Sequence, residues 1–202
     1  MEVAVPAETA SERGRQTRQR LVAAAIELIP EVGWAAVTTR RVAERAGVRP
    51  GLVHYHFDSV ASLLTTAAVE FAREALGTPL RELRAASDPA DGLVRLLAAL
   101  DAYDGRDPGS LLMIEATLAA TRDAALRAAF AELLDDFRAD VAEWLTGHAV
   151  PDAAECAALL CALLDGIVLH RGLSQTPDAR SLAGPLGRLL AAPAPTDERS
   201  PR

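Results

Sequence analysis

The chain of 202 residues contains no lysine, so every permanent positive side chain is an arginine, which we attribute to codon usage. It has only two cysteines, Cys156 and Cys161. Five positions apart on one predicted helix, they point about 140° away from each other. This spacing excludes a disulfide or a paired metal site and predicts two buried, free thiols.

Long apolar runs are also missing. No stretch reaches the roughly 18 consecutive apolar residues that a membrane helix needs. The N-terminus lacks the basic-then-apolar order of a signal peptide. These absences predict a cytoplasmic protein that has no membrane partner.

The sequence motifs of common enzymes and metal proteins are absent as well. No glycine-rich phosphate loop follows a predicted strand. His54 and His56 are two positions apart, and Asp165 and His170 are five apart, so neither pair shares one helix face as a metal-binding i, i+4 pair would. The segment DGRDPG, residues 104–109, has Arg and Pro where a calcium loop needs oxygen ligands. We therefore expect no enzyme activity, no metal and no cofactor.

The formal net charge is −7, but its distribution along the chain is uneven. Residues 1–65 hold eight arginines against seven acidic residues, whereas the remainder holds thirteen against twenty-one. The eight arginines lie in two groups, at positions 13–20 and 40–49. A local basic patch is sufficient for DNA binding, even in an acidic protein. The first group could be an arm that contacts phosphates or a solvated helix start, and the sequence leaves both open.

The stretch from Thr38 to Phe57, TTRRVAERAGVRPGLVHYHF, has the pattern of two short helices joined by a tight turn. A threonine at 38 or 39 can cap the first helix, and Gly47 can end it in a left-handed conformation. Pro50 suits the first turn of the second helix, where its missing N–H costs nothing. Apolar residues at helical spacing predict a buried side made of Val42, Ala43, Ala46, Val53 and Phe57.

The other side of the second helix carries Arg, Gly, His and Tyr, which is typical of a helix that lies on a charged partner. Helix-turn-helix motifs place such a helix in the DNA major groove, with glycine allowing close approach. We therefore predict that double-stranded DNA is bound by Thr38, Thr39, Arg40, Arg49, Pro50, Gly51, His54, Tyr55 and His56.

The order Gly-Val-x-x-Gly-x-Val-x-Tyr-His-Phe, followed by Ser59 and Leu63-Leu64, resembles the DNA-binding segment of TetR-family transcriptional repressors. The resemblance extends from about Arg15 to Phe71. His54 stands where the family often has tyrosine, and Val60 where it often has a lysine that meets a phosphate. The resemblance implies a ligand-responsive repressor that binds a palindromic operator as a dimer, with Arg40 where family members often contact a base.

The rest of the chain also has helical periodicity, so the predicted fold class is all-α. We expect disordered tails at 1–12 and 192–202, a DNA-binding domain at 13–58, and a regulatory and dimerisation domain at 59–191. The expected helices include 15–32, 59–76, which Gly77-Thr78-Pro79 would end, a short piece at 80–86, and 110–120, 123–146, 153–173 and 178–191.

Helix 153–173 is apolar nearly all round, which is typical of a helix buried on all sides. In so short a chain this pattern predicts a partner subunit, and we expect a homodimer through helices 153–173 and 178–191.

A small apolar or amphiphilic effector is expected among the helices after the DNA-binding domain, because such pockets are largely apolar with a few polar anchors. The alternative is that the aromatic residues are ordinary core. A second alternative for the whole chain is a helical small-molecule-binding or adaptor protein that does not act on DNA. The predicted ligand-binding residues are Tyr103, Met113, Glu115, Phe130, Leu134, Phe137, Trp144 and Asp165.

Overall fold

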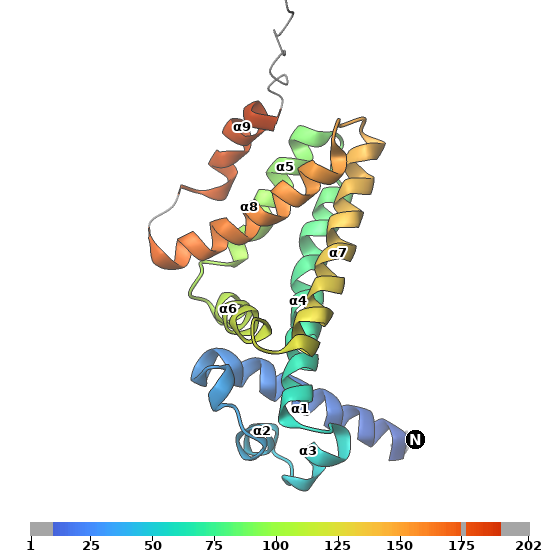
Figure 1. Ribbon diagram of the computed structural model, residues 1–202, viewed down its shortest axis with the longest axis vertical. Helices are drawn as coiled ribbons and strands as arrows, with labels where there is room; N and C mark the ends of the chain where they lie inside the picture. Colours follow the sequence, from blue (N-terminus) through green and yellow to red (C-terminus); the bar gives the residue numbers. More distant parts are fainter. Residues whose placement is uncertain (1–9, 175–176, 191–202) are drawn as a thin grey trace, which may run out of the picture. The chain divides into compact units, whose positions relative to one another are not determined.

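The computed structural model describes residues 10–174 and 177–190, and over these residues the secondary structure is helical with no strand, which confirms the all-α class. Figure 1 shows the helices in chain order. Their bounds are α1 Ala10–Val32, η1 Trp34–Ala36, α2 Thr39–Ala46, α3 Gly51–His56, α4 Val60–Arg84, α5 Pro89–Ala98, η2 Ala99–Ala102, α6 Pro108–Ala120, α7 Ala124–Gly147, α8 Ala153–Leu173 and α9 Ala179–Leu190.

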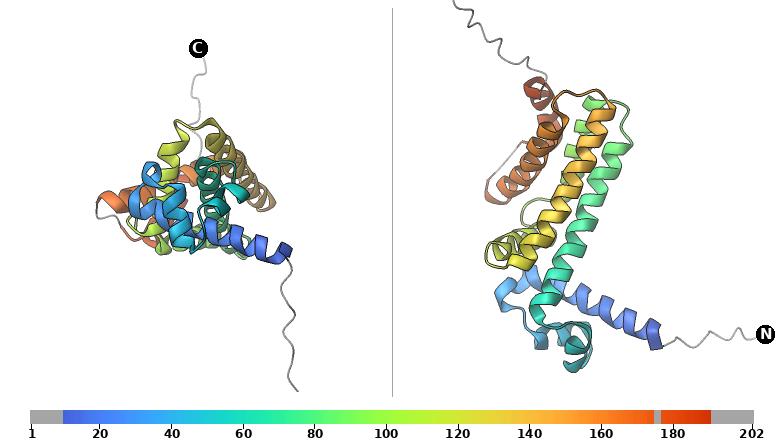
Figure 2. Two further views of the ribbon diagram at one scale, coloured as in Figure 1. Left: turned by 90° about the horizontal axis from the view of Figure 1, so that it is seen from below. Right: turned by 45° about the vertical axis from the view of Figure 1, so that its right-hand side comes forward.

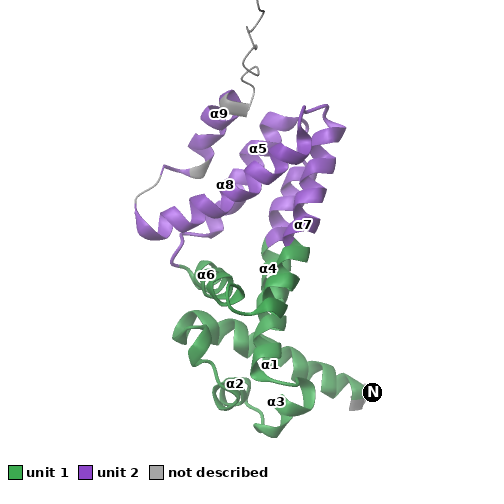
Figure 3. Ribbon diagram, in the orientation of Figure 1, with its two compact units in different colours: residues 1–75, 107–133 green, residues 76–106, 134–202 purple. Residues whose placement is uncertain are grey.

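The chain divides into two compact units, which Figure 3 shows in different colours. Unit 1 comprises residues 1–75 and 107–133, and unit 2 comprises residues 76–106 and 134–202. This division by packing differs from the functional domains that we predicted at 13–58 and 59–191. Residues 107–133, expected in the regulatory domain, pack with the N-terminal helices.

In unit 1, α1 contacts α2 and α6, and α2 contacts α3. Both views of Figure 2 show α2 and α3 beside the start of α4. The buried side that periodicity predicted for α2 and α3 is present: Val42, Ala43, Ala46, Val53 and Phe57 are all buried. They share one core with the stripe of α1, which includes Leu21, Ala25, Leu28 and Ile29, and with Leu63, Leu64, Ala67 and Ala68 of α4.

Unit 2 has a second core, to which α5, α7, α8 and α9 contribute. The largest fully buried side chains there are Leu83, Leu96, Leu97 and Val141. Asp88 caps α5, because its Oδ1 accepts the amide of Asp91 at 2.9 Å. Gly105, at φ 81°, lies so close to α8 that a Cβ there would stand 2.2 Å from the amide nitrogen of Gly172. Only glycine fits at this contact.

Helix α4 corrects the prediction of a break at Gly77-Thr78-Pro79. It continues through Pro79 to Arg84, so the expected separate piece at 80–86 is mostly its last turns. A proline inside a helix costs about 3 kcal/mol because it removes a hydrogen bond and crowds the preceding turn. Here Pro79 and Leu83 are buried and Leu80 packs on the core of unit 2, so tertiary packing offsets the local cost.

Helix α1 begins at Ala10, so residues 10–12, which we predicted as part of a disordered tail, are helical. The predictions for residues 1–9 and for the tail at 192–202 lie outside the described residues.

Helix α8 is the helix for which the sequence predicted burial on all sides with the help of a partner subunit. Over the part of the chain that the structure describes, it is a 21-residue helix that is long and apolar enough to cross a membrane by length and composition alone. It buries one side in unit 2 through Ala157, Leu160, Cys161, Leu164 and Ile167. Its other side leaves Leu159, Leu169 and Leu173 exposed, so it is not buried all round in a single chain.

The two cysteines of α8 are free, as predicted. Cys161 is buried and Cys156 is partly buried. Burial raises the pKa of the Cys161 thiol, which disfavours the reactive thiolate.

Candidate nucleic-acid interface

The first helix of the candidate interface, α2, starts from a side-chain cap. Thr38 has extended backbone, and its Oγ1 accepts the amide of Arg41 at 3.3 Å. This satisfies one of the free donors at the helix start. Of the two threonines that the sequence offered, Thr38 is the cap.

The turn after α2 closes in a Schellman arrangement. Gly47 adopts the left-handed region at φ 63° and ψ 39°, and the amide of Val48 donates to the carbonyl of Ala43 at 2.9 Å. Arg20 of α1 donates to the carbonyl oxygens of Ala46 and Gly47. The last carbonyls of α2 are therefore satisfied by the turn and by a side chain from another helix.

The second helix, α3, is held by its inner side. Val53 is fully buried, and the amide of Phe57 donates to the carbonyl of Val53 at 2.9 Å. The guanidinium of Arg18 lies 5.1 Å from the centroid of the Phe57 ring, a cation–π contact, and it also pairs with Glu70 of α4 at 3.3 Å. These contacts fix α3 on the core of unit 1.

The outer side of the motif presents the residues that the sequence singled out. Thr39 and His56 are partly exposed, and the other seven predicted DNA-binding residues are exposed. Tyr55 is 80% exposed, and its ring meets that of His56 edge-on with centroids 5.0 Å apart. Leu52, which sequence reasoning missed, is exposed three positions before Tyr55 and could offer an apolar contact to a thymine methyl group.

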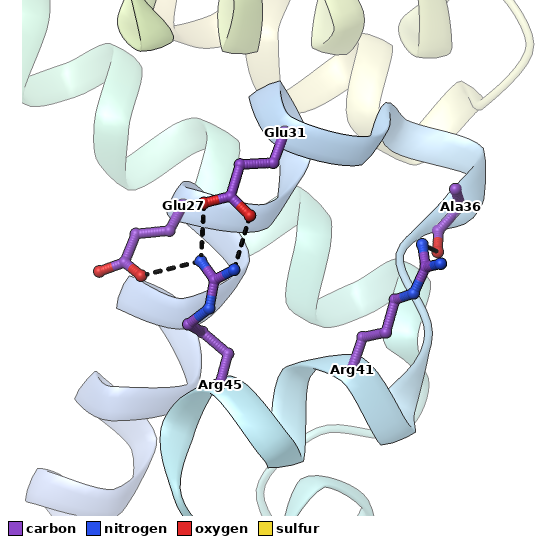
Figure 4. A network of polar contacts seen from close by, with 5 residues as sticks. All are labelled: Glu27, Glu31, Ala36, Arg41 and Arg45. Atoms are coloured by element: carbon purple, nitrogen blue, oxygen red, sulfur yellow. Dashed lines mark hydrogen bonds and ion pairs between the residues drawn. The ribbon is translucent and has the colours of Figure 1, made fainter.

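Several arginines of the basic patch are engaged inside unit 1. Arg45 forms two parallel hydrogen bonds with Glu31, at 3.0 and 2.6 Å, and a third with Glu27 at 3.1 Å (Figure 4). These bonds raise the pKa of the Arg45 guanidinium, and the bond from Arg45 lowers the pKa of Glu31. Arg41 donates to the carbonyl of Ala36 at 2.9 Å. A count of arginines therefore overstates the positive charge that is available to DNA.

Four other arginines of the patch point to solvent. Arg40 pairs with Glu44 one turn later on α2 at 3.0 Å, with 84% of the Arg40 side chain exposed. Such exposed pairs are worth a few tenths of a kcal/mol, so Arg40 can exchange this partner at little cost. Arg49, Arg13 and Arg15 are exposed as well.

The predicted ligand-binding residues do not gather in one unit. Met113, Glu115 and Phe130 belong to unit 1, and Tyr103, Leu134, Phe137, Trp144 and Asp165 belong to unit 2.

Several of these residues have structural contacts of their own. Phe130 and Phe137 are buried in separate cores. Trp144 stacks on His148 with ring centroids 4.1 Å apart and packs tightly on Gly92. The carboxylate of Glu115 accepts the backbone amide of Trp34 at 2.8 Å.

Unit 2 has an open polar cleft of about 1030 Å³ that the sequence did not indicate. Arg180 pairs with Asp101 across it at 3.0 Å, and Arg171 donates to the carbonyl oxygens of Leu100 and Tyr103. Of the predicted ligand residues, Tyr103 lines it. Gly105 and Gly172 are in contact, next to the lining residues Asp104, Arg106 and Arg171. Because these two glycines are far apart in the sequence, the cleft could not be predicted from it. Its lining is Asp101, Tyr103, Asp104, Arg106, Arg171, Ser174, Pro177, Asp178 and Arg180.

Comparison with known families places two matches on this chain. The family described as "Bacterial regulatory proteins, tetR family" matches residues 21–67, which contain α2, α3, the second half of α1 and the start of α4. The family described as "Tetracyclin repressor-like, C-terminal domain" matches residues 84–192, more than half of the chain.

Individual relatives agree with these matches. An HTH-type transcriptional regulator of Mycobacterium tuberculosis is 29% identical over 182 residues, which cover 85% of this chain and 91% of that protein. A crystal structure of a transcriptional regulator from Streptomyces coelicolor A3(2) is 30% identical with a TM-score of 0.73, covering 87% of this chain and 98% of that one. The multidrug binding protein EbrR, crystallised with imidazole, is 32% identical with a TM-score of 0.71, covering 96% and 100%.

Proposed function

The chain belongs to the TetR family of bacterial regulatory proteins, and from that premise we propose that it is a repressor that binds a palindromic operator as a homodimer and is released by a small molecule. It is a ligand-responsive, DNA-binding transcriptional regulator, and a helical adaptor that does not act on DNA is not favoured. Its operator and its site of action would be in the cytoplasm.

One observation carries the operator proposal: the outer side of α2 and α3 is exposed, while the inner side is packed on the core of unit 1. The Thr38 cap, the Gly47 turn and the buried Val53 fix the backbone. Arg40, Tyr55 and their neighbours are left facing solvent on that rigid support. Phosphate contacts position such a helix and base contacts give it specificity.

The test uses the DNA beside the gene that encodes this chain. An inverted repeat there is the candidate operator, and we expect tight binding to it that weakens steeply with salt as phosphate contacts are lost. A scrambled repeat of equal length and composition is the control. Equal binding to both fragments, or no salt-dependent retention on either, would contradict the proposal.

The proposed homodimer uses α8 and α9. Leu159, Leu169 and Leu173 recur on one side of α8 and are 62%, 46% and 75% exposed in a single chain. A row of exposed leucines on one helix is unfavourable in water and is typical of a subunit interface. A two-fold dimer would present two α3 helices to the two halves of a palindrome.

The proposed effector is apolar or amphiphilic and binds among the helices that follow the DNA-binding motif. EbrR, which is 32% identical, was crystallised with imidazole and, in a second structure that is 29% identical, with malachite green. Both are nitrogen compounds that an acidic anchor could favour. Of the two acidic anchors that we predicted, Glu115 is occupied by Trp34, so Asp165 is the anchor that we retain.

Release requires that the effector and the operator favour different conformations. Helix α4 has residues in both units, so we propose that it carries that difference. A coupling of about 1–3 kcal/mol is sufficient for regulation, and it must be reciprocal. DNA should therefore weaken effector binding by the same factor as effector weakens DNA binding. A compound that quenches Trp144 fluorescence in a Trp34→Phe variant but leaves operator affinity unchanged is not the inducer.

A further inference from the structure

The segment that joins α1 to α2 is a three-residue helix, η1, with an unusual start. Gly33, which follows α1, has φ 80° and ψ 151°. As a glycine it has no side chain that could cap η1. The amide of Trp34 is thus one of the donors that a short helix leaves free. Glu115 of α6, 81 positions later in the chain, accepts this amide through its Oε2 at 2.8 Å.

The Glu115 carboxylate lies directly against the chain at this point. Its two oxygens stand 3.6 and 3.8 Å from where a Cβ of Gly33 would be. The bond is partly buried, and Trp34 packs against the core of unit 1. A charge-assisted hydrogen bond in such a place is stronger than one on the surface, because less water competes with it.

The far end of η1 is held as well. Arg41 of α2 donates to the carbonyl of Ala36, the last residue of η1, at 2.9 Å (Figure 4). The next two residues are the buried Val37 and Thr38, the cap of α2. Both ends of the short piece of chain that leads into α2 are therefore held by side chains, the start by Glu115 of α6 and the end by Arg41 of α2 itself.

We propose that Glu115 is a positioning residue for operator binding: by holding the start of η1 it sets where α2 and the turn into α3 lie on α1. Helix α6 can provide this support because it contacts both α1 and η1. The role does not require Glu115 to touch DNA or an effector. The inference rests on the proposed operator binding.

Three substitutions separate the reach of the side chain from its charge. Glu115→Gln keeps an oxygen at the same distance but removes the charge, Glu115→Asp keeps the charge but shortens the side chain by one methylene, and Glu115→Ala removes both. Thr117→Ala, an exposed position on the same helix, is the matched control.

We expect operator affinity at fixed salt to fall on the order of tenfold for Glu115→Ala and Glu115→Asp, and about two- to threefold for Glu115→Gln. Loss of a negative charge alone would strengthen DNA binding, so a fall in Glu115→Ala cannot come from charge. Hydrogen exchange of the Trp34 amide in the free protein should accelerate most in Glu115→Ala and Glu115→Asp and least in Glu115→Gln. Thr117→Ala should change neither quantity.

Two results would overturn the proposal. One is operator affinity within about twofold of the wild type in both Glu115→Ala and Glu115→Asp, at a temperature where both are folded. The other is an operator affinity that depends only on the charge at position 115. Glu115→Asp would then bind the operator like the wild type, and Glu115→Gln would bind it like Glu115→Ala. If Glu115→Ala does not fold, the comparison of Asp with Gln still decides. Failure of the wild type to bind the operator would defeat the proposed function too, whereas these two results defeat only the role of Glu115.

Discussion

The outer side of α2 and α3 and the outer side of α8 are both exposed, yet they consist of opposite chemistry. The first carries arginine, threonine, histidine and an 80% exposed tyrosine. The second carries a row of leucines, of which Leu173 is 75% exposed. Polar donors are hydrogen-bonded by water when exposed and can bind phosphates instead. Exposed apolar area is unfavourable by about 25 cal/mol per Å² until it is covered. The two sides therefore suit different partners: DNA for the first and, in the dimer that we propose, a second copy for the other.

The assignment of a second copy to α8 is wrong if this helix is not an interface. Leu159→Glu combined with Leu173→Glu should give monomers, because a two-fold interface would bring the new charges of both copies together. Operator affinity should fall on the order of 100-fold or more, since each half-site would be bound without the other. Sedimentation velocity and binding to the operator measure the two effects, and circular dichroism should show unchanged helix content.

Val94→Glu is the control for this experiment, because Val94 is an exposed apolar residue of α5, 42% exposed, outside the proposed interface. It should stay dimeric and bind the operator normally. Sedimentation of the wild type as a monomer at micromolar concentration would contradict the dimer outright.

Arg40 is the residue at which base recognition by α2 can be tested. Its pairing with Glu44 is exposed and weak, so the guanidinium is free to meet a base. If it reads a guanine, Arg40→Ala should weaken operator binding by about 1–3 kcal/mol and relax preference at one base pair. Tyr55→Ala should weaken all sequences evenly if Tyr55 holds a phosphate. Binding to a library of operator variants distinguishes the two, and an unchanged preference would mean that Arg40 is not a base reader.

The sequence predicted those features that depend on neighbouring residues. Helical spacing identified Val42, Ala43 and Ala46 as buried, and local chemistry identified a threonine cap at 38 or 39 and the Gly47 turn. These follow from propensity and periodicity alone.

Features that depend on distant residues were not predictable in this way. Arg45 counts as a basic residue in the sequence, but it is paired with Glu27 and Glu31 of another helix. Nothing near Glu115 in the sequence indicates Trp34 as its partner. The break predicted at Pro79 was wrong because tertiary packing outweighed a local rule.

Two arginines of α1 distinguish internal support from DNA contact. Arg20 holds the end of α2 through the carbonyl groups of Ala46 and Gly47, whereas Arg13 is exposed. Arg20→Ala should lower the free energy of unfolding by about 1 kcal/mol, or roughly 2–4 °C in Tm, and Arg13→Ala should leave it unchanged. Both remove one positive charge, so they form a matched pair. An equal Tm for the two variants would show that the Arg20 contacts contribute nothing to stability.

The smallest expected effect concerns Asp165, an exposed acidic residue of α8. Its side chain reaches solvent, but surrounding atoms desolvate it and raise its pKa above 3.8, an effect that the charge of Arg138 partly opposes. The folded state thus binds the proton more readily than the unfolded chain. The stabilising contribution is complete below pH 3.8 and is lost as the pH rises through the higher, folded-state pKa. At pH 7 the ionised carboxylate is therefore a net cost.

Asp165→Asn should consequently raise Tm at pH 7 by roughly 1–2 °C, a small gain because water screens an exposed carboxylate. The gain should vanish below pH 3.8, where the wild-type side chain is already neutral. Asp136→Asn, at an exposed position on α7, is the control and should change little. A gain that is the same at both pH values would contradict this account, because it could not come from the titration of Asp165.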